Sequence, residues 1–259
     1  MRTFERPLAV VGHRVAGESI VSGLPENSLA SCRAAHEQGA DWVELDARLT
    51  ADGELVLHHD HFLPNGQPVD EATVDDCRTQ GVAGFDEVLE ALPEGLGVDL
   101  EVKVSLRDAS GPVIETTGGR VAARARELRS SRPVVITSFS PAALLQARQV
   151  AADEVPLGLL GLAIAPLGEL VPSAVALGAD LIAPHVLTFG LVEIAGLPLE
   201  PVERVRRALD TAWQHGCEVL VWGVRPAQVG DLAALGVDAV CVDEVAETVA
   251  AVPRDPAGR

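Results

Sequence analysis

The chain has 259 residues, of which 47% are hydrophobic, and it carries a formal net charge of −18 at pH 7. A chain of this length is typical of a single α/β barrel and provides enough apolar residues for a large core. The strong negative charge excludes a protein that binds nucleic acid or anionic lipid through a basic surface, since such binding depends on clustered Lys and Arg.

The expected secondary structure alternates between short apolar runs and longer helical patterns. Expected strands cover residues 8–12, 42–48, 98–104, 134–137, 157–160, 179–183, 218–222 and 237–242, and expected helices cover residues 28–38, 85–92, 119–130, 141–150, 168–177, 202–215, 226–235 and 245–251. Eight strands that each precede a helix predict a (β/α)8 TIM barrel, with residues 1–259 as one domain. A doubly wound sheet would also alternate strands and helices, but its glycine-rich GxGxxG turn is missing.

Two segments fall outside this repeat. Residues 54–83 follow the second strand, and we expect the second arm of a β-hairpin followed by a small polar insert at about residues 61–83. Residues from 253 onward are expected to form a disordered tail.

No targeting or membrane segment is predicted. The first residues lack the apolar stretch of a secretory signal. The most apolar long stretch, residues 155–171, contains two prolines, several glycines and one glutamate, which indicates strand and helix rather than a membrane span. The four cysteines form no CxxC pair and indicate free thiols in a reducing environment, so we expect a cytoplasmic protein.

The barrel prediction also predicts where the chemistry lies. Active sites of this fold gather at the carboxyl ends of the strands. The polar or aromatic residues expected at those ends are His13, Arg14, Glu44, Asp46, Glu101, Lys103, Ser138, His185 and Trp222.

Three acids among these residues indicate a metal site. Glu44 and Asp46 are two residues apart, so both side chains leave a strand by the same face, and the same holds for Glu101 and Lys103. Three carboxylates that meet in a barrel mouth repel one another unless a cation joins them, and oxygen ligands suit Mg²⁺ or Ca²⁺. The alternative is that Glu101 pairs with Lys103 or an arginine, and that Glu44 or Asp46 faces solvent.

Two histidines are candidates for acid–base chemistry. His13 ends the first strand, and His59 ends the hairpin arm. A single histidine is more often a packed or surface residue, but two beside a carboxylate cluster can act as general base and general acid. Because His58 alternates with His59, only one of them points to the site. We favour His59, with Asp60 helping to shape the loop.

Four further residues are candidates for contact with the substrate. Arg14 and Lys103, the only lysine in the chain, would form an anion site suited to phosphate. A surface salt bridge is the alternative for Arg14, and chance in an arginine-rich composition is the alternative for Lys103. His185 and Trp222 would line the pocket, and the alternative for both is packing in the barrel.

Short motifs in chain order resemble the glycerophosphodiester phosphodiesterase family. They are His-Arg-Val at 13–15, Pro-Glu-Asn-Ser at 25–28, Glu-Leu-Asp at 44–46, Thr-Ala-Asp-Gly at 50–53, His-Asp at 59–60 and Glu-Val-Lys at 101–103. Residues 25–28 also indicate a helix start, with Asn27 or Ser28 as the N-cap.

The resemblance implies a TIM barrel that hydrolyses a glycerophosphodiester to an alcohol and glycerol 3-phosphate. It implies a divalent cation, Mg²⁺ or Ca²⁺, on Glu44, Asp46 and Glu101, with His13 and His59 as the acid–base pair. It also implies that Arg14 and Lys103 hold the phosphodiester and that the insert after the second strand recognises the alcohol. The attacking group is water or a neighbouring substrate hydroxyl that gives a cyclic phosphate.

Departures from the family pattern leave the substrate open. Val15 replaces a glycine, the loop at residues 15–24 is longer than usual, and Gly223 and Arg225 follow Trp222 where Thr and Asn are common. The partner expected is a small phosphodiester, and the oligomeric state is not predicted. Two alternatives are phospholipase D-like action on lysophospholipid or sphingolipid diesters and a catalytically silent barrel that binds a phosphorylated ligand.

Overall fold

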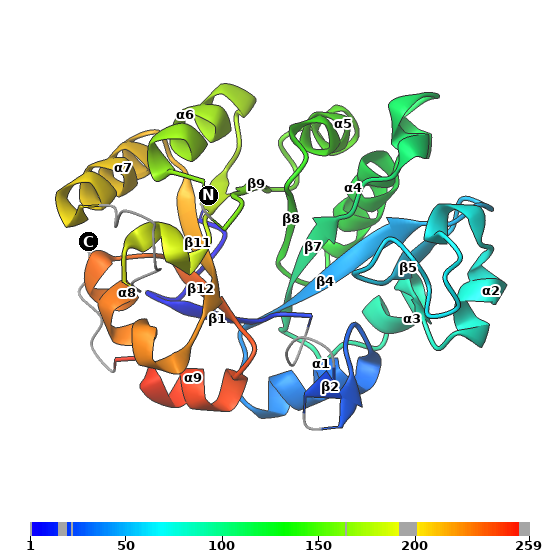
Figure 1. Cartoon of the computed structure of the whole chain (residues 1–259), viewed down its shortest axis with the longest axis horizontal. Coiled ribbons are helices and arrows are strands. Elements are labelled where there is room, and N and C mark those ends of the chain that lie inside the picture. The colour runs from blue at the N-terminus through cyan, green and yellow to red at the C-terminus, as the bar shows by residue number, and fades with distance from the viewer. Residues whose placement is uncertain (1, 15–19, 22, 164, 192–200, 254–259) are drawn as a thin grey trace.

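Eight parallel strands close into a barrel in the computed structural model, which describes residues 2–14, 20–21, 23–163, 165–191 and 201–253. The order around the barrel is β1, β12, β11, β10, β9, β8, β7 and β4, and β1 pairs with β4 to close it (Figure 1). The strands are β1 (Ala9–Gly12), β4 (Trp42–Leu49), β7 (Gly97–Val102), β8 (Val134–Ser138), β9 (Leu157–Leu160), β10 (Leu181–Ala183), β11 (Glu218–Val224) and β12 (Ala239–Val242).

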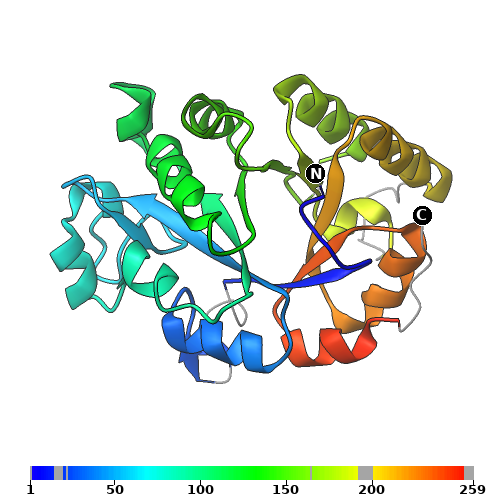
Figure 2. The same cartoon turned by 180° about the vertical axis from the view of Figure 1, so that it is seen from behind.

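A helix follows each barrel strand, and the helices lie around the outside of the barrel (Figure 2). Their limits reflect ordinary signals: Ser28 caps α1, Pro141 begins α5, and Gly178 and Gly236 end α6 and α8 in the left-handed conformation. The helices are α1 (Leu29–Glu37), α3 (Phe85–Leu89), α4 (Thr117–Leu128), α5 (Pro141–Ala151), α6 (Leu167–Leu177), α7 (Val202–Gln214), α8 (Val229–Leu235) and α9 (Val245–Ala251).

The segment after β4 forms the expected hairpin arm and insert. Strand β5 (Leu55–Leu57) pairs antiparallel with β4, after a turn in which Gly53 has φ +83°. The insert has a small apolar cluster of its own and contains α2 (Val74–Thr79), a helix that the sequence did not predict. The remaining short elements are β2 (Ile20–Val21), β3 (Leu24–Pro25), β6 (Ala83–Gly84), and the 3-10 helices η1 (Val69–Glu71), η2 (Leu106–Ala109), η3 (Val113–Glu115), η4 (Val186–Phe189) and η5 (Pro226–Gln228).

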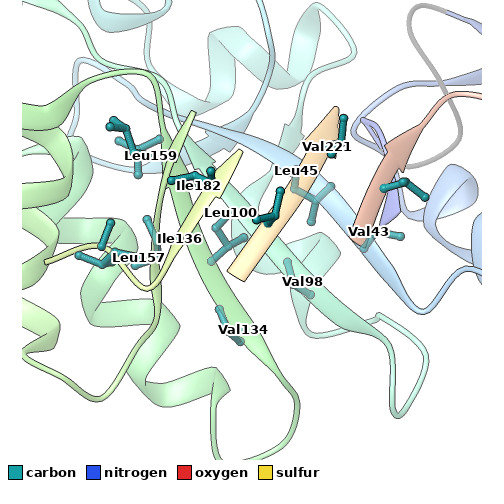
Figure 3. Packing of buried hydrophobic residues seen from close by; sticks show 14 of the residues in the cluster. Val43, Leu45, Val98, Leu100, Val134, Ile136, Leu157, Leu159, Ile182 and Val221 are labelled. Carbon is teal, nitrogen blue, oxygen red and sulfur yellow. The ribbon is translucent and has the colours of Figure 1, made fainter. Parts of the chain in front are cut away.

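The alternation of side chains along the strands separates two apolar clusters. Val43 and Leu45 of β4 belong to the large cluster between the barrel and the helices (Figure 3). Trp42 belongs to the cluster inside the barrel, where its ring packs edge-on against that of Phe4, with centroids 5.2 Å apart. Because successive strand residues face opposite sides, Glu44 falls on the same side as Trp42. The strand that builds the core therefore also directs acids into the barrel.

The fold prediction is confirmed. All eight expected strands and all eight expected helices are present, although the strand predicted to reach residue 104 ends at Val102 and the helix predicted to reach residue 92 ends at Leu89. The single-domain interpretation stays a prediction. The longer loop at residues 15–24 lies mostly outside the described residues, as does the tail at 254–259. Within the described part of the chain, no helix combines the length and apolar character needed to cross a membrane.

Candidate active site

Seven of the nine predicted site residues line one cavity of about 280 Å³ at the carboxyl ends of the barrel strands, and Asp46 and His185 are not among its described lining residues. One part of its lining is charged, and the other is mainly apolar. The lining residues are His13, Arg14, Glu44, His59, Asp99, Glu101, Lys103, Thr137, Phe139, Leu160, Leu220, Trp222 and Cys241.

Three of the acids converge inside the barrel. Strands β4 and β7 are parallel neighbours whose register places Asp46 opposite Glu101, and Glu44 lies two residues before Asp46. One carboxylate oxygen from each acid lies within 4.8 Å of the others. All three side chains are buried, so the alternative that Glu44 or Asp46 faces solvent does not describe this structure.

The hydrogen bonding of these acids fits a cation. Glu44 Oε2 accepts from the backbone N–H of Arg14 at 2.7 Å, and Asp46 Oδ2 accepts from Asn27 Nδ2 at 2.8 Å. By contrast, Glu44 Oε1 is buried and accepts no hydrogen bond, while Asp46 Oδ1 and Glu101 Oε1, buried beside it, are paired with the ammonium group of Lys103. Buried carboxylate oxygens are costly unless a donor or a cation satisfies them. The donor set is all oxygen, which suits a hard divalent cation such as Mg²⁺ or Ca²⁺.

Lys103 shares the acid cluster. Its Nζ lies 3.0 Å from Asp46 Oδ1 and 2.5 Å from Glu101 Oε1, so the pairing of Glu101 with Lys103 occurs together with the convergence of the acids. Burial opposes the charge on Lys103, but the neighbouring carboxylates outweigh it and raise the pKa of the ammonium group. Burial and repulsion from the other acids raise the pKa of Glu44. Burial would also raise the pKa of Asp46, but the positive charge of Lys103 and the smaller effects of its other neighbours outweigh burial and lower it.

Both candidate histidines line the cavity, and each is held by an aspartate. His13 Nδ1 lies 2.8 Å from Asp243 Oδ1, and His59 Nδ1 lies 2.8 Å from Asp60 Oδ1. A carboxylate that accepts the Nδ1 proton leaves Nε2 to exchange a proton with a ligand. Burial lowers the pKa of His59. His58 instead contacts the carbonyl of Phe62 and is not among the described residues that line the cavity.

Arg14 lies in the mouth of the barrel rather than on the outer surface. Only 11% of its side chain is exposed, and the guanidinium contacts Glu26 through Nη1 at 3.4 Å and Asp46 through Nε at 3.8 Å. Its backbone is left-handed, with φ +45°. Arg14 and Lys103 thus place two positive groups beside the three acids.

The aromatic side of the cavity is formed by Phe139 and Trp222, whose rings pack edge-on with centroids 5.7 Å apart. Trp222 Nε1 donates to the carbonyl of Gly161 at 3.2 Å, which fixes the indole. His185 packs against Trp222, with centroids 4.3 Å apart, but it is not among the described residues that line the cavity. Its Nδ1 accepts from the N–H of Leu187. The structure therefore places His185 behind the aromatic wall.

Several neighbours of the site were not identified from the sequence. Asp99 lies two residues before Glu101, so the same period-two rule could have found it, and burial raises its pKa to about 8. Asp243 directly follows the last strand, where strand-end reasoning also applies. Asn27 belongs to the Pro-Glu-Asn-Ser motif, but it was interpreted as a helix start rather than as a partner of the acids. Ser138, expected at the mouth, instead donates to the carbonyl of Val102.

Comparisons with known proteins point to one family. The model of the glycerophosphoryl diester phosphodiesterase family matches residues 13–247. A glycerophosphodiester phosphodiesterase of Caldanaerobacter subterraneus is 26% identical over 91% of this chain and 93% of its own length. The solved structure of a glycerophosphodiester phosphodiesterase from Thermotoga maritima superposes with a TM-score of 0.70; it is 20% identical, and the alignment covers 94% of this chain and 97% of that one. The structure of an Oleispira antarctica phosphodiesterase in complex with its product sn-glycerol-3-phosphate superposes with a TM-score of 0.72; it is 22% identical, and the alignment covers 94% of this chain and 96% of that one.

The fold, the site and the family match define the class of the protein as a phosphoric diester hydrolase built on a TIM barrel. The chain belongs to the glycerophosphoryl diester phosphodiesterase family.

Proposed function

We propose that the protein hydrolyses a glycerophosphodiester to an alcohol and glycerol 3-phosphate, with a divalent cation, Mg²⁺ or Ca²⁺, as cofactor. The observation that carries this proposal is the group of three buried carboxylates that converge around one ammonium group, with Glu44 Oε1 left without a donor, beside a cavity lined by the two aspartate-bound histidines. The family match and the glycerol phosphate bound to the Oleispira relative support the choice of substrate.

Glu44, Asp46 and Glu101 are the proposed metal ligands. When bound, the cation supplies Lewis-acid stabilisation of the negative charge that builds up on the phosphoryl oxygens. The charge of the bound cation also offsets the mutual repulsion of the three acids. Lys103 and Arg14, which line the same cavity, would bind the remaining phosphoryl oxygens.

The two histidines would transfer the protons. The Nε2 of one histidine accepts the proton of the attacking hydroxyl while the hydroxyl oxygen forms its bond to phosphorus. The Nε2 of the other histidine donates a proton to the oxygen of the leaving alcohol while the bond between that oxygen and phosphorus breaks. Asp243 and Asp60 hold the rings in the orientation that this exchange needs. The same pair serves attack by water and attack by a neighbouring substrate hydroxyl.

The apolar wall formed by Phe139 and Trp222 would contact the part of the substrate beyond the phosphate. It lies in the same cavity as the charged residues, so a small diester can touch both. The proposed partner is therefore a small molecule. The four cysteines are free and buried, which supports the proposal of a reducing, cytoplasmic location.

A panel of diesters tests this proposal. Purified protein is incubated with glycerophosphocholine, glycerophosphoethanolamine, lysophosphatidylcholine or sphingomyelin in Mg²⁺ or Ca²⁺, and products are followed by ³¹P NMR. We expect glycerol 3-phosphate from the two glycerophosphodiesters. Turnover of the lipids alone would favour phospholipase D-like action, and no turnover of any diester would favour a silent binding barrel.

A further inference from the structure

Asn27 has a backbone and an environment that a helix start does not require. It precedes α1, its φ is +52°, and only 3% of it is exposed. Ser28, rather than Asn27, is the N-cap of α1 and completes a capping box with Ser31. Positive φ is uncommon outside glycine and persists where surrounding contacts stabilise it. Because Ser28 provides the cap and asparagine itself tolerates positive φ, what distinguishes Asn27 is its burial and the contacts of its side chain.

That side chain makes two hydrogen bonds, both to Asp46. Asn27 Nδ2 donates to Asp46 Oδ2 at 2.8 Å, and Asn27 Oδ1 accepts from the backbone N–H of Asp46 at 2.9 Å. A carboxamide can donate to a carboxylate and accept from an N–H at once, which neither a carboxylate nor an apolar group can do. The two bonds fix the Asp46 carboxylate and leave Oδ1 among the other acids.

A second left-handed residue holds a second acid. Arg14 has φ +45°, and its N–H donates to Glu44 Oε2 at 2.7 Å. Its carbonyl accepts from the N–H of Asn27 at 3.1 Å. Two strained residues from separate segments are thus joined by one backbone hydrogen bond, and each binds one oxygen of one acid. The oxygens that they leave unbound are both buried: Glu44 Oε1 accepts no hydrogen bond, and Asp46 Oδ1 lies 3.0 Å from Lys103 Nζ.

We propose that Asn27 is a positioning residue of the metal centre, which orients Asp46 so that Oδ1 faces the cation. The inference rests on the proposed metal site. Partners that orient metal ligands typically change metal affinity or activity by about 10- to 100-fold when they are removed. Asn27 would contribute through Asp46, without contact with substrate or metal.

Calorimetric titration of EDTA-stripped protein with Ca²⁺ and with Mg²⁺ tests the proposal. Asn27→Gly removes the side chain but tolerates positive φ, so the turn is kept. We expect its metal affinity to fall about 10- to 100-fold. Asn27→Asp keeps the oxygen that accepts from the Asp46 N–H, but it replaces the donor to Asp46 Oδ2 by a second oxygen that repels it. We expect a similar loss of metal affinity. Ser28→Ala is the matched control: it removes the cap of α1 and lowers the melting temperature, with metal affinity unchanged.

The outcomes separate this inference from the proposal beneath it. Wild-type protein that binds neither ion overturns the metal site and the inference together. Wild-type protein that binds while Asn27→Gly matches its affinity overturns the inference alone. Circular dichroism checks the fold of each variant. If Asn27→Gly does not fold, the isosteric Asn27→Asp decides, and wild-type affinity in that variant overturns the inference.

Discussion

Lys103 Nζ lies 3.0 Å from Asp46 Oδ1, one of the oxygens that we propose to bind the cation. The same ammonium group contacts Glu101. Among the described residues, Lys103 is thus the closest counter-ion of Asp46 and Glu101, and its side chain is only 12% exposed. The stability of the barrel mouth should therefore depend on Lys103 most strongly when no metal is present.

Lys103→Met should lower the free energy of unfolding in EDTA by about 3 kcal/mol, because removing one partner of a buried ion pair leaves uncompensated charge. Saturating Ca²⁺ or Mg²⁺ should restore more stability to this variant than it adds to the wild type. Urea unfolding with and without metal measures both effects. Arg126→Met is the control, since it breaks an exposed pair with Glu154 and should cost less than about 1 kcal/mol. Equal stability of Lys103→Met and wild type in EDTA would contradict the account.

His13→Ala and His59→Ala should each lower kcat by about 10²- to 10⁴-fold, because each removes one proton transfer. Their roles can be separated with a diester whose leaving group is p-nitrophenol, which departs without a general acid. The variant that lacks the acid should recover most of its rate on this substrate, and the variant that lacks the base should not. Metal affinity measured by calorimetry should stay within a few-fold of wild type. Two variants that both keep wild-type rates on glycerophosphocholine would sink the acid–base pair.

Asp99→Asn should change how stability depends on pH. Burial raises the pKa of Asp99 from 3.8 to about 8 in the folded protein. The stabilisation from its bound proton is complete below pH 3.8 and falls by about 1.4 kcal/mol per pH unit as pH rises towards 8. Asparagine stays neutral and can still accept the hydrogen bond that Thr137 Oγ1 donates to Asp99.

The variant should therefore gain stability relative to wild type between pH 5 and pH 8, by a few kcal/mol. Urea unfolding in EDTA at both pH values measures this difference. Parallel pH curves for the two proteins would show that Asp99 does not hold its proton in the folded state.

Trp222→Ala should raise KM for glycerophosphocholine by about tenfold, because it removes an apolar contact with the substrate and little that acts on the phosphate. His185 contacts Trp222 rather than the cavity. His185→Ala should therefore have a smaller effect and should add nothing in a Trp222→Ala background. Steady-state kinetics of the single and double variants measure the coupling. Additive effects would instead assign His185 a separate contact with the substrate.

The parts of the site that follow from strand periodicity were predictable from the sequence. Glu44, Asp46 and Glu101 converge because they occupy inward positions on neighbouring parallel strands. The hairpin turn at Gly53 likewise explains how His59 returns to the barrel mouth.

Contacts that depend on loop conformation were not predictable. Asn27 contacts Asp46 from a left-handed backbone position, and residue type alone does not reveal that contact. His185 ends a strand as expected, yet it becomes the N-cap of η4 and packs behind Trp222. Strand-end position therefore identifies candidates, while the following turn decides which of them face the cavity.

Metal removal and replacement is the sharpest test of whether a cation held by Glu44, Asp46 and Glu101 is needed for turnover. Protein is stripped with EDTA, desalted and assayed for release of glycerol 3-phosphate from glycerophosphocholine, before and after addition of Mg²⁺ or Ca²⁺, beside an Asp46→Asn variant. We expect no turnover by stripped protein, recovery on addition of about one ion per chain, and no recovery by Asp46→Asn. Full activity of the stripped protein, or equal activity of wild type and Asp46→Asn, would contradict this expectation.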